Sequence, residues 1–288
     1  MNAKLIGLLA ETSIHPGAGQ SSGVVDLPVA REAATDYPVV PGSSLKGALL
    51  SFVRHTGTDG KARISEGQRK TIFGAVETKS EDGKLEGGAG ALLVSDARLL
   101  LLPVRSLHTA SKWVTCPHLL ERFTRDSQRA GSPVGVTTSS VSAGGYLGAS
   151  NGALFLEERQ FSHAGTIGAD LLAALAPLIP HETTRARLKE NLVVLQDDDF
   201  VWFARHGLAV QARNVLEETR KTSQNLWYEE AIPADALLYT LLTERQDGAL
   251  DAVLDLFKDR PYLQVGGNET VGMGWFAVAL PEAKGGAA

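Results

Sequence analysis

The order of apolar and polar positions along the chain predicts strands alternating with helices. Apolar side chains dominate residues 4–13 and 91–104, which predicts two strands, the second of them long and buried. Between these strands, apolar residues recur at i, i+3, i+4, i+7 and i+8 within 43–55, the spacing of one helix face. They are Leu45, Ala48, Leu49, Phe52 and Val53. The pattern therefore predicts a β-α-β unit with a long loop at 15–42.

A second strand–helix–strand unit is expected towards the C-terminal end. Residues 236–243 predict a strand, 249–257 a helix and 274–280 a final strand. Two such units predict an α+β fold with a ferredoxin-like sheet that carries helices on one face. Shorter elements are expected elsewhere: helices at 68–73, 117–130, 170–179 and 197–205, strands at 153–161 and 262–265, and a helix-to-strand passage at 188–195.

Three segments without a long apolar period predict large insertions in this core. Residues 77–90 are charged and glycine-rich, which is typical of a mobile surface loop, and 131–152 are rich in Ser, Gly and Thr. Residues 207–233 carry apolar pieces on either side of a polar tip, so a hairpin is expected there. We expect one domain over 1–280 and a disordered tail at 281–288. Loops of this length in a compact domain are usually functional or disordered.

Composition restricts the class of protein. The 288 residues are 43% hydrophobic and 21% charged, as in ordinary globular proteins, and no apolar run could span a bilayer. The apolar stretch at the N-terminus is too short for a signal peptide, so we expect a cytoplasmic protein with no membrane partner. A single cysteine, Cys116, excludes an internal disulfide and a thiolate metal cluster. The net charge of −5 argues against a broad basic surface for nucleic acid, so any RNA contacts must be local.

The long loop at 15–42 contains the first candidate chemistry. Gly17 and Gly19 would let a phosphate backbone approach exposed amides, and His15 and Asp26 could serve acid–base or metal chemistry. From spacing alone, a solvated loop in which Asp26 caps a turn is the favoured interpretation.

The start of the helix at 43–55 is the second candidate. Ser43, Ser44 and the free N–H groups of the first turn could bind an anion, with Lys46 reaching outward. The alternative is a helix capped by Ser43 or Ser44 with a surface lysine. The spacing of a nucleotide-binding P-loop is absent, which excludes nucleotide hydrolysis.

Two later segments have similarly open interpretations. Residues 264–274 contain Gly266, Gly267 and Asn268 in a loop that either lets another backbone approach or simply connects two strands. Tyr228 and Glu229, an aromatic residue beside carboxylates, could stack on a base or ligate a metal. More often such a run is a strand edge.

Five motifs in this order resemble the RAMP superfamily and, within it, the backbone subunits of type III-B (Cmr) CRISPR complexes. The resemblance covers nearly the whole chain; each motif alone is weak, and their order carries it. The motifs are Val25-Asp26-Leu27-Pro28, Pro41-Gly42-Ser43-Ser44-Leu45-Lys46-Gly47-Ala48, Asp96-Ala97-Arg98-Leu99-Leu100-Leu101-Leu102-Pro103-Val104-Arg105-Ser106, Leu226-Trp227-Tyr228-Glu229-Glu230 and Gly266-Gly267-Asn268-Glu269-Thr270-Val271-Gly272.

The resemblance implies an RRM-like palm with inserted fingers and a thumb hairpin, expected at about 207–233. It implies that several copies stack head-to-tail on one crRNA, together with other Cmr subunits, and that each thumb interrupts the duplex between crRNA and target RNA. Asp26 stands at the position of the family's target-cleaving aspartate, and Lys46 at that of its crRNA-binding lysine. The expected RNA-binding residues are Ser43, Ser44, Lys46, Gly17, Gly19, Arg31, Gly266, Gly267 and Asn268.

The expected reaction is attack by the RNA's own 2′-OH, which a displaced nucleotide can bring into line with its phosphorus. Asp26 would hold Mg²⁺, or another divalent cation such as Mn²⁺, or would take the proton. His15, Tyr228 and Glu229 rank below it as helpers. The alternatives are a catalytically inactive crRNA-binding scaffold, a stand-alone metal-dependent RNase that processes crRNA precursors, and, as an outsider, a small-molecule enzyme.

Overall fold

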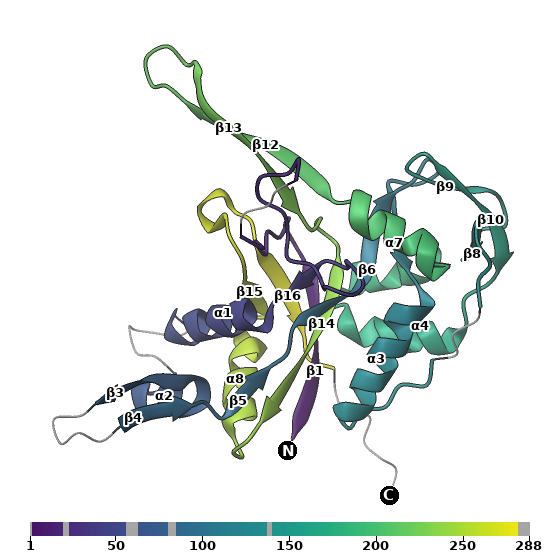
Figure 1. Ribbon diagram of the computed structural model, residues 1–288. Helices are drawn as coiled ribbons and strands as arrows, with labels where there is room; N and C mark the ends of the chain where they lie inside the picture. Colours follow the sequence, from purple (N-terminus) through teal and green to yellow (C-terminus); the bar gives the residue numbers. More distant parts are fainter. Residues whose placement is uncertain (1, 20–22, 56–62, 80–84, 137–139, 282–288) are drawn as a thin grey trace, which may run out of the picture.

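The computed structural model describes residues 2–19, 23–55, 63–79, 85–136 and 140–281 (Figure 1). Its central elements are β1 (Ala3–Ala10), α1 (Gly42–His55), β6 (Ala97–Arg105), β14 (Leu237–Glu244), α8 (Ala249–Asp259) and β16 (Trp275–Ala279). The strands lie in the order β16-β1-β14-β6, and each runs antiparallel to its neighbours. This β-α-β-β-α-β order with its sheet pairing is the ferredoxin-like fold that the sequence predicts.

Helices cover both faces of the central sheet. Ile6 and Leu8 of β1 belong to the apolar cluster that contains α1 and α8. Leu9 belongs to a second cluster, with α3 (Pro117–Arg129) and α4 (Ala169–Leu175). Successive side chains of a strand point to opposite faces, so both faces of β1 are buried. The two helices of the ferredoxin-like unit, α1 and α8, thus lie on one face as expected, and the long insertion between β6 and β14 adds a second layer on the other face.

Gly7 allows this second layer to approach the sheet closely. The 3₁₀ helix η1 (Ala176–Leu178) follows α4 and crosses β1 at this point. A Cβ atom on Gly7 would lie 2.5 Å from the backbone oxygen of Leu178. Only a residue without a side chain fits there.

Further strands extend the sheet at both edges, to a total of 12 within the described residues. The extension runs β7-β11-β8-β10-β9, and β2, β5 and β15 pair with β6, β14 and β16. The strands are β2 (Val39–Val40), β5 (Leu92–Val94), β7 (Ser111–Thr115), β8 (Gly145–Leu147), β9 (Leu154–Leu156), β10 (Arg159–Gly165), β11 (Leu192–Leu195) and β15 (Tyr262–Gln264). The remaining helices are α2 (Glu66–Phe73), α5 (Glu182–Ala186), α6 (Leu188–Asn191), α7 (Asp197–His206) and the 3₁₀ helix η2 (Glu269–Val271). None of the helices within the described ranges is both long and apolar enough to cross a bilayer.

Two antiparallel ladders project from different sides of the body (Figure 1). Strands β12 (Ala209–Leu216) and β13 (Ser223–Ala231) form the hairpin expected at 207–233. Strands β3 (Gly74–Lys79) and β4 (Leu85–Ala89) form the other, so the described part of 77–90 is largely strand where a mobile surface loop is predicted; residues 80–84 lie outside the described residues. A ladder outside the core is held by backbone hydrogen bonds and needs no apolar alternation. The predicted tail lies outside the described residues from 282 onward.

Candidate functional site

The loop that contains Asp26 is joined to the base of the β12–β13 hairpin. The N–H of Leu27 donates to the carbonyl of Tyr228 (3.1 Å), and the N–H of Glu230 donates to the carbonyl of Leu27 (2.9 Å). Asp26 Oδ2 accepts a hydrogen bond from the backbone N–H of Tyr228 at 2.8 Å. Asp26 is exposed. The fold thus fixes a solvent-facing carboxylate beside the hairpin, through contacts between segments about 200 residues apart in the sequence.

His15 lies beneath this loop and is 8% exposed. Its Nδ1 is 2.7 Å from the carbonyl oxygen of Glu230. A carbonyl can only accept, so Nδ1 carries a proton and donates to it. This hydrogen bond holds the buried His15 ring close to the base of the hairpin, where the predicted helper role requires it. One of its two ring nitrogens, Nδ1, is occupied by the Glu230 carbonyl.

The two glycine-rich segments meet at His15. A Cβ on Gly266 would lie 2.6 Å from the His15 carbonyl oxygen, and Gly266 has a φ of 92°. Both the close approach and the backbone conformation therefore require glycine at this position. The N–H of Gly267 donates to the same oxygen at 3.0 Å. A Cβ on Gly17 would lie 3.2 Å from His15 Nε2. The backbone that Gly266 and Gly267 approach is therefore the chain's own loop; their predicted RNA contacts, and those of exposed Gly17 and Gly19, stay predictions.

Glu229 is buried and saturated with internal donors. Its Oε2 accepts from Asn268 Nδ2 (2.7 Å) and Arg213 Nε (3.2 Å), and its Oε1 accepts from Trp227 Nε1 (2.8 Å). Burial by itself would raise the pKa of Glu229, but these hydrogen bonds outweigh it and lower the pKa below its usual value. Glu229 and Asn268 therefore join the hairpin to the loop at 264–274, which favours a positioning role for Glu229 over the predicted catalytic one.

Tyr228 contributes its backbone to Asp26, and its side chain remains available. The residue is 43% exposed, and Leu226 and Val210 on the same hairpin are 53% and 49% exposed. An apolar surface next to an exposed carboxylate suits contact with an unstacked base. The catalytic role of Tyr228 stays a prediction.

The start of α1 differs from the expectation. The helix begins at Gly42, whose N–H donates to Asp96 Oδ1 at 2.7 Å, so neither Ser43 nor Ser44 is the N-cap. A carboxylate at this position already satisfies one free donor and complements the helix dipole. Ser43 and Ser44 are exposed in the first turn, and their RNA contacts stay predictions.

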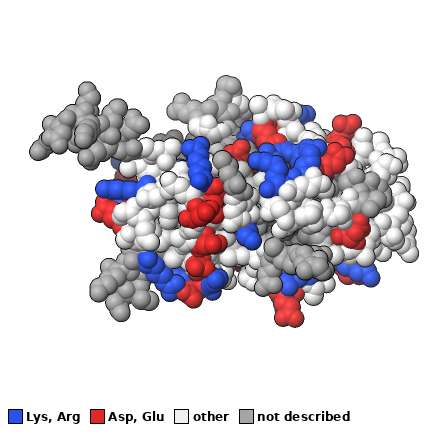
Figure 2. Space-filling view, turned by 90° about the horizontal axis from the view of Figure 1, so that it is seen from below, with Lys and Arg blue, Asp and Glu red and all other residues white. Residues whose placement is uncertain are grey.

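Lys46 lines an open groove beside the β3–β4 ladder. The same groove, of roughly 520 Å³, is lined by Arg245, which the sequence analysis did not single out. Arg245 follows β14 directly, at the end of a buried strand, and its N–H donates to the carbonyl of Ala91. Two cations on one groove form a local basic site. Figure 2 shows one face of the molecule, on which Lys and Arg are intermixed with Asp and Glu, consistent with the net charge of −5.

Arg31 has internal partners. Its guanidinium donates to Glu230 Oε1 (2.5 Å) and to the carbonyls of Asp36 (2.8 Å) and Ala204 (2.7 Å). Its side chain is 17% exposed. These bonds argue against the predicted RNA contact and indicate a structural role.

A metal ion at Asp26 would need ligands other than the side chains of the described residues. Within the described parts of the chain, no group of three or more His, Cys, Asp or Glu side chains could hold a metal. Asp26 is exposed, whereas the carboxylates of Glu229 and Glu230 are hydrogen-bonded internally. Mg²⁺ binds readily through one carboxylate together with phosphates and water. The donor set therefore fits a metal shared with RNA and does not fit a site built by protein alone.

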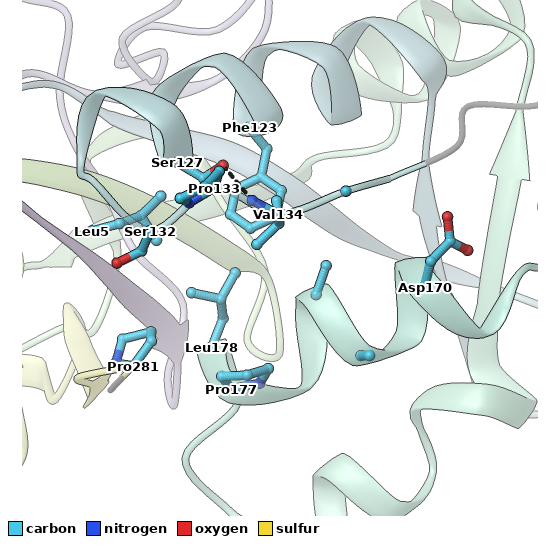
Figure 3. A pocket seen from close by; sticks show the side chains of 13 residues that line it. Leu5, Phe123, Ser127, Ser132, Pro133, Val134, Asp170, Pro177, Leu178 and Pro281 are labelled. Carbon is cyan, nitrogen blue, oxygen red and sulfur yellow. Dashed lines mark hydrogen bonds between the residues drawn. The ribbon is translucent and has the colours of Figure 1, made fainter. Parts of the chain in front are cut away.

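An apolar cavity of roughly 410 Å³ lies apart from these residues, between α3 and α4 (Figure 3). Phe123, Val134, Pro177 and Leu178 line it, and Ser127 Oγ accepts a hydrogen bond from the N–H of Val134 at its wall. None of the described residues of the loop at 15–31 or of the hairpin lines it. It takes no part in the candidate site.

A ferredoxin-like sheet with a projecting hairpin, and an aspartate loop joined to the base of that hairpin, define the class of protein. The family model of the RAMP superfamily matches residues 8–277, so the chain belongs to this superfamily. This confirms the resemblance that the five motifs indicate.

Particular relatives refine the class. The chain is 34% identical to the "CRISPR system Cmr endoribonuclease Cmr4" of Pyrococcus furiosus, over 98% of this chain and 97% of that protein. It is 26% identical to the "CRISPR system CMR subunit Cmr4" of Saccharolobus solfataricus, over 92% of each. Among solved structures, oligomeric Cmr4 from Pyrococcus furiosus matches with a TM-score of 0.73 and 27% identity over 98% of both chains. A chain of a type III-B Cmr-beta complex bound to cognate target RNA shares the fold, with a TM-score of 0.74 and 19% identity over 97% of both chains.

Proposed function

We propose that this chain is a backbone subunit of a type III-B CRISPR ribonucleoprotein, which binds crRNA and cleaves the complementary target RNA, one cut per copy. The observation that carries the proposal is the exposed Asp26 carboxylate fixed at the base of the hairpin. Identity of 34% over nearly the full length of a protein named an endoribonuclease supports it. That the same relative crystallised as an oligomer supports stacking of copies, alongside other Cmr subunits.

The hairpin would create the reactive geometry. In a regular A-form helix the 2′-oxygen is poorly aligned with the adjacent phosphorus. A nucleotide displaced by the exposed apolar residues of the hairpin can rotate until its 2′-oxygen is in line, which is an orientation effect. The 2′-oxygen then bonds to phosphorus and the bond from phosphorus to the 5′-oxygen breaks. The 5′-oxygen takes a proton from water, so a 2′,3′-cyclic phosphate and a 5′-hydroxyl result.

Asp26 is placed to act on the 2′-hydroxyl. The backbone N–H of Tyr228 fixes one carboxylate oxygen, so the orientation of the group is set before RNA binds. In this role Asp26 accepts the proton of the attacking hydroxyl. His15 is a candidate to assist, because the bond from its Nδ1 to the Glu230 carbonyl holds the ring at the base of the hairpin and leaves Nε2 as its other nitrogen.

A divalent cation fits the same place. Asp26 and the RNA phosphates would hold Mg²⁺ or Mn²⁺ together, and the ion would supply charge neutralisation at the scissile phosphate. Whichever role Asp26 has, its removal should affect the chemical step and leave base pairing between crRNA and target intact.

The test is a reconstituted complex with crRNA, partner subunits, Mg²⁺ and a labelled complementary RNA. We expect evenly spaced cuts with wild type, no cuts with Asp26→Asn, and equal target binding by both. Asp251→Asn, an exposed carboxylate in the first turn of α8, is the matched control and should cut normally. Cuts that persist unchanged in Asp26→Asn, or their absence with wild type, would instead support the inactive crRNA-binding scaffold.

A further inference from the structure

Glu230 connects the hairpin to both sides of the Asp26 loop. Its Oε2 accepts from the backbone N–H of Val29 (3.1 Å), and its own N–H donates to the carbonyl of Leu27 (2.9 Å). Its carbonyl oxygen accepts from His15 Nδ1 (2.7 Å). One residue of β13 therefore holds the chain before Asp26, at His15, and after it, at Leu27 and Val29.

Arg31 completes this arrangement and extends it to a third segment. Its guanidinium pairs with Glu230 Oε1, and the two side chains are 17% and 8% exposed. The same guanidinium donates to the carbonyl of Ala204 in α7, which leads directly into β12. The pair thus ties the Asp26 loop to both strands at the base of the hairpin.

The chemistry of this pair differs from that of a surface ion pair. A buried charge pair often stabilises a fold no better than apolar packing would, so its presence calls for a positional explanation. Arginine offers a planar set of donors that fixes direction as well as distance. Here three acceptors from three segments converge on one guanidinium, and their relative positions are fixed by it.

We propose that Glu230 and Arg31 are positioning residues that hold Asp26 at a set place relative to the hairpin, and so determine which phosphate is cut. The inference rests on the proposed function. The hairpin selects the displaced nucleotide, and the Glu230–Arg31 pair places the carboxylate against that nucleotide. Loosening the pair moves Asp26 relative to the RNA without removing any group that contacts RNA.

The test uses single-turnover cleavage of a labelled complementary RNA by the assembled complex, read at single-nucleotide resolution. Glu230→Ala removes both side-chain acceptors. A misplacement of about 1 Å at a reacting group costs on the order of 100-fold, so we expect the cleavage rate to fall roughly 10- to 100-fold, with new products at neighbouring phosphates. Glu230→Gln keeps the shape of the side chain and one acceptor oxygen. It should therefore cut faster than Glu230→Ala and should place more of its cuts at the wild-type phosphates.

Two controls separate position from general stability. Glu157→Gln changes a carboxylate that pairs with Arg105 at the turn after β9, and should leave both the rate and the cut positions unchanged. Binding of crRNA and target is measured for every variant and should stay within about two-fold of wild type, because no RNA contact is removed. If Glu230→Ala does not assemble, Glu230→Gln and Arg31→Lys carry the same measurement.

The outcomes distinguish this inference from the proposed function. Variants that cut the same phosphates at the wild-type rate would overturn the positioning role while leaving the RNase intact. A uniform loss of target binding with unchanged cut positions would overturn it as well, because it would show a structural role alone. No cleavage by wild type would instead remove the proposed function.

Discussion

Glu229→Gln is the substitution that most sharply tests how the hairpin is held. In wild type, one carboxylate oxygen faces two donors, Arg213 and Asn268, and the other faces a third, the indole N–H of Trp227. Glutamine has one acceptor and one donor group of the same size. In either orientation of the amide, its NH₂ group faces at least one of these donors. That donor then loses its hydrogen bond and is repelled by the NH₂ group.

The magnitude follows from burial. A hydrogen bond to a charged group contributes about 1.5–3 kcal/mol, and a buried donor left unsatisfied costs about 1–3 kcal/mol. The Glu229 side chain is 7% exposed, but that of Arg213 is 28% exposed. Water can therefore replace part of the hydrogen bond that Arg213 loses. We therefore expect the free energy of unfolding to fall by about 2 kcal/mol at pH 7.

The pH dependence has a definite sign. The folded-state pKa of Glu229 lies below its usual value of 4.5, because hydrogen bonds from Trp227, Asn268 and Arg213 outweigh the opposing effect of burial. A lowered pKa contributes stability that is fully present above the unfolded value and is lost as pH falls through the folded value. The difference between wild type and Glu229→Gln should therefore be full at pH 7 and shrink below about pH 4.5.

Urea unfolding of the isolated protein at several pH values measures this difference. Glu218→Gln, an exposed carboxylate at the tip of the same hairpin, makes the same change of charge without the donors and should shift stability little. Equal stability of wild type and Glu229→Gln at pH 7, or a difference that persists undiminished in acid, would refute the hydrogen-bond argument.

Two further predictions concern other parts of the chain. Gly7→Ala should lower the free energy of unfolding by about 1–3 kcal/mol, because the new Cβ lies 2.5 Å from a backbone oxygen; thermal unfolding measures this, with Gly47→Ala on the open surface of α1 as control. Lys46→Ala and Arg245→Ala should each weaken crRNA binding and reduce the slope of log affinity against log salt by about 0.7–1, as filter binding over a salt series would show; an unchanged slope for Arg245→Ala would remove it from the RNA interface.

The central sheet could be predicted from sequence because its strands and helices have clear periods. Strand β1 is apolar except for Lys4, and α1 has apolar residues at helical spacing. Strand β7 was missed because Ser111–Thr115 is short and contains Lys112, whose amine is satisfied by the Glu190 carbonyl. The β3–β4 ladder was missed because it lies outside the core and lacks alternation.

The candidate site was predictable only in part. Asp26 and Lys46 were identified by resemblance, since spacing alone favoured a solvated loop and a surface lysine. The partners of Arg31 and Glu229 could not be predicted, because they depend on contacts across as many as 199 residues. The cap at Gly42 was misplaced for the same reason: Asp96, which binds its N–H, is 54 residues away.

In the proposed function, each copy of this chain cuts its own target phosphate through Asp26. The most direct measurement assembles complexes from mixtures of wild-type and Asp26→Asn protein and follows the rate of cleavage at each position of one labelled target RNA. The account predicts that every cut falls in proportion to the fraction of Asp26→Asn copies and vanishes when all copies carry it, with target binding unchanged. Cleavage that does not depend on that fraction would contradict the account and place the nuclease in another subunit.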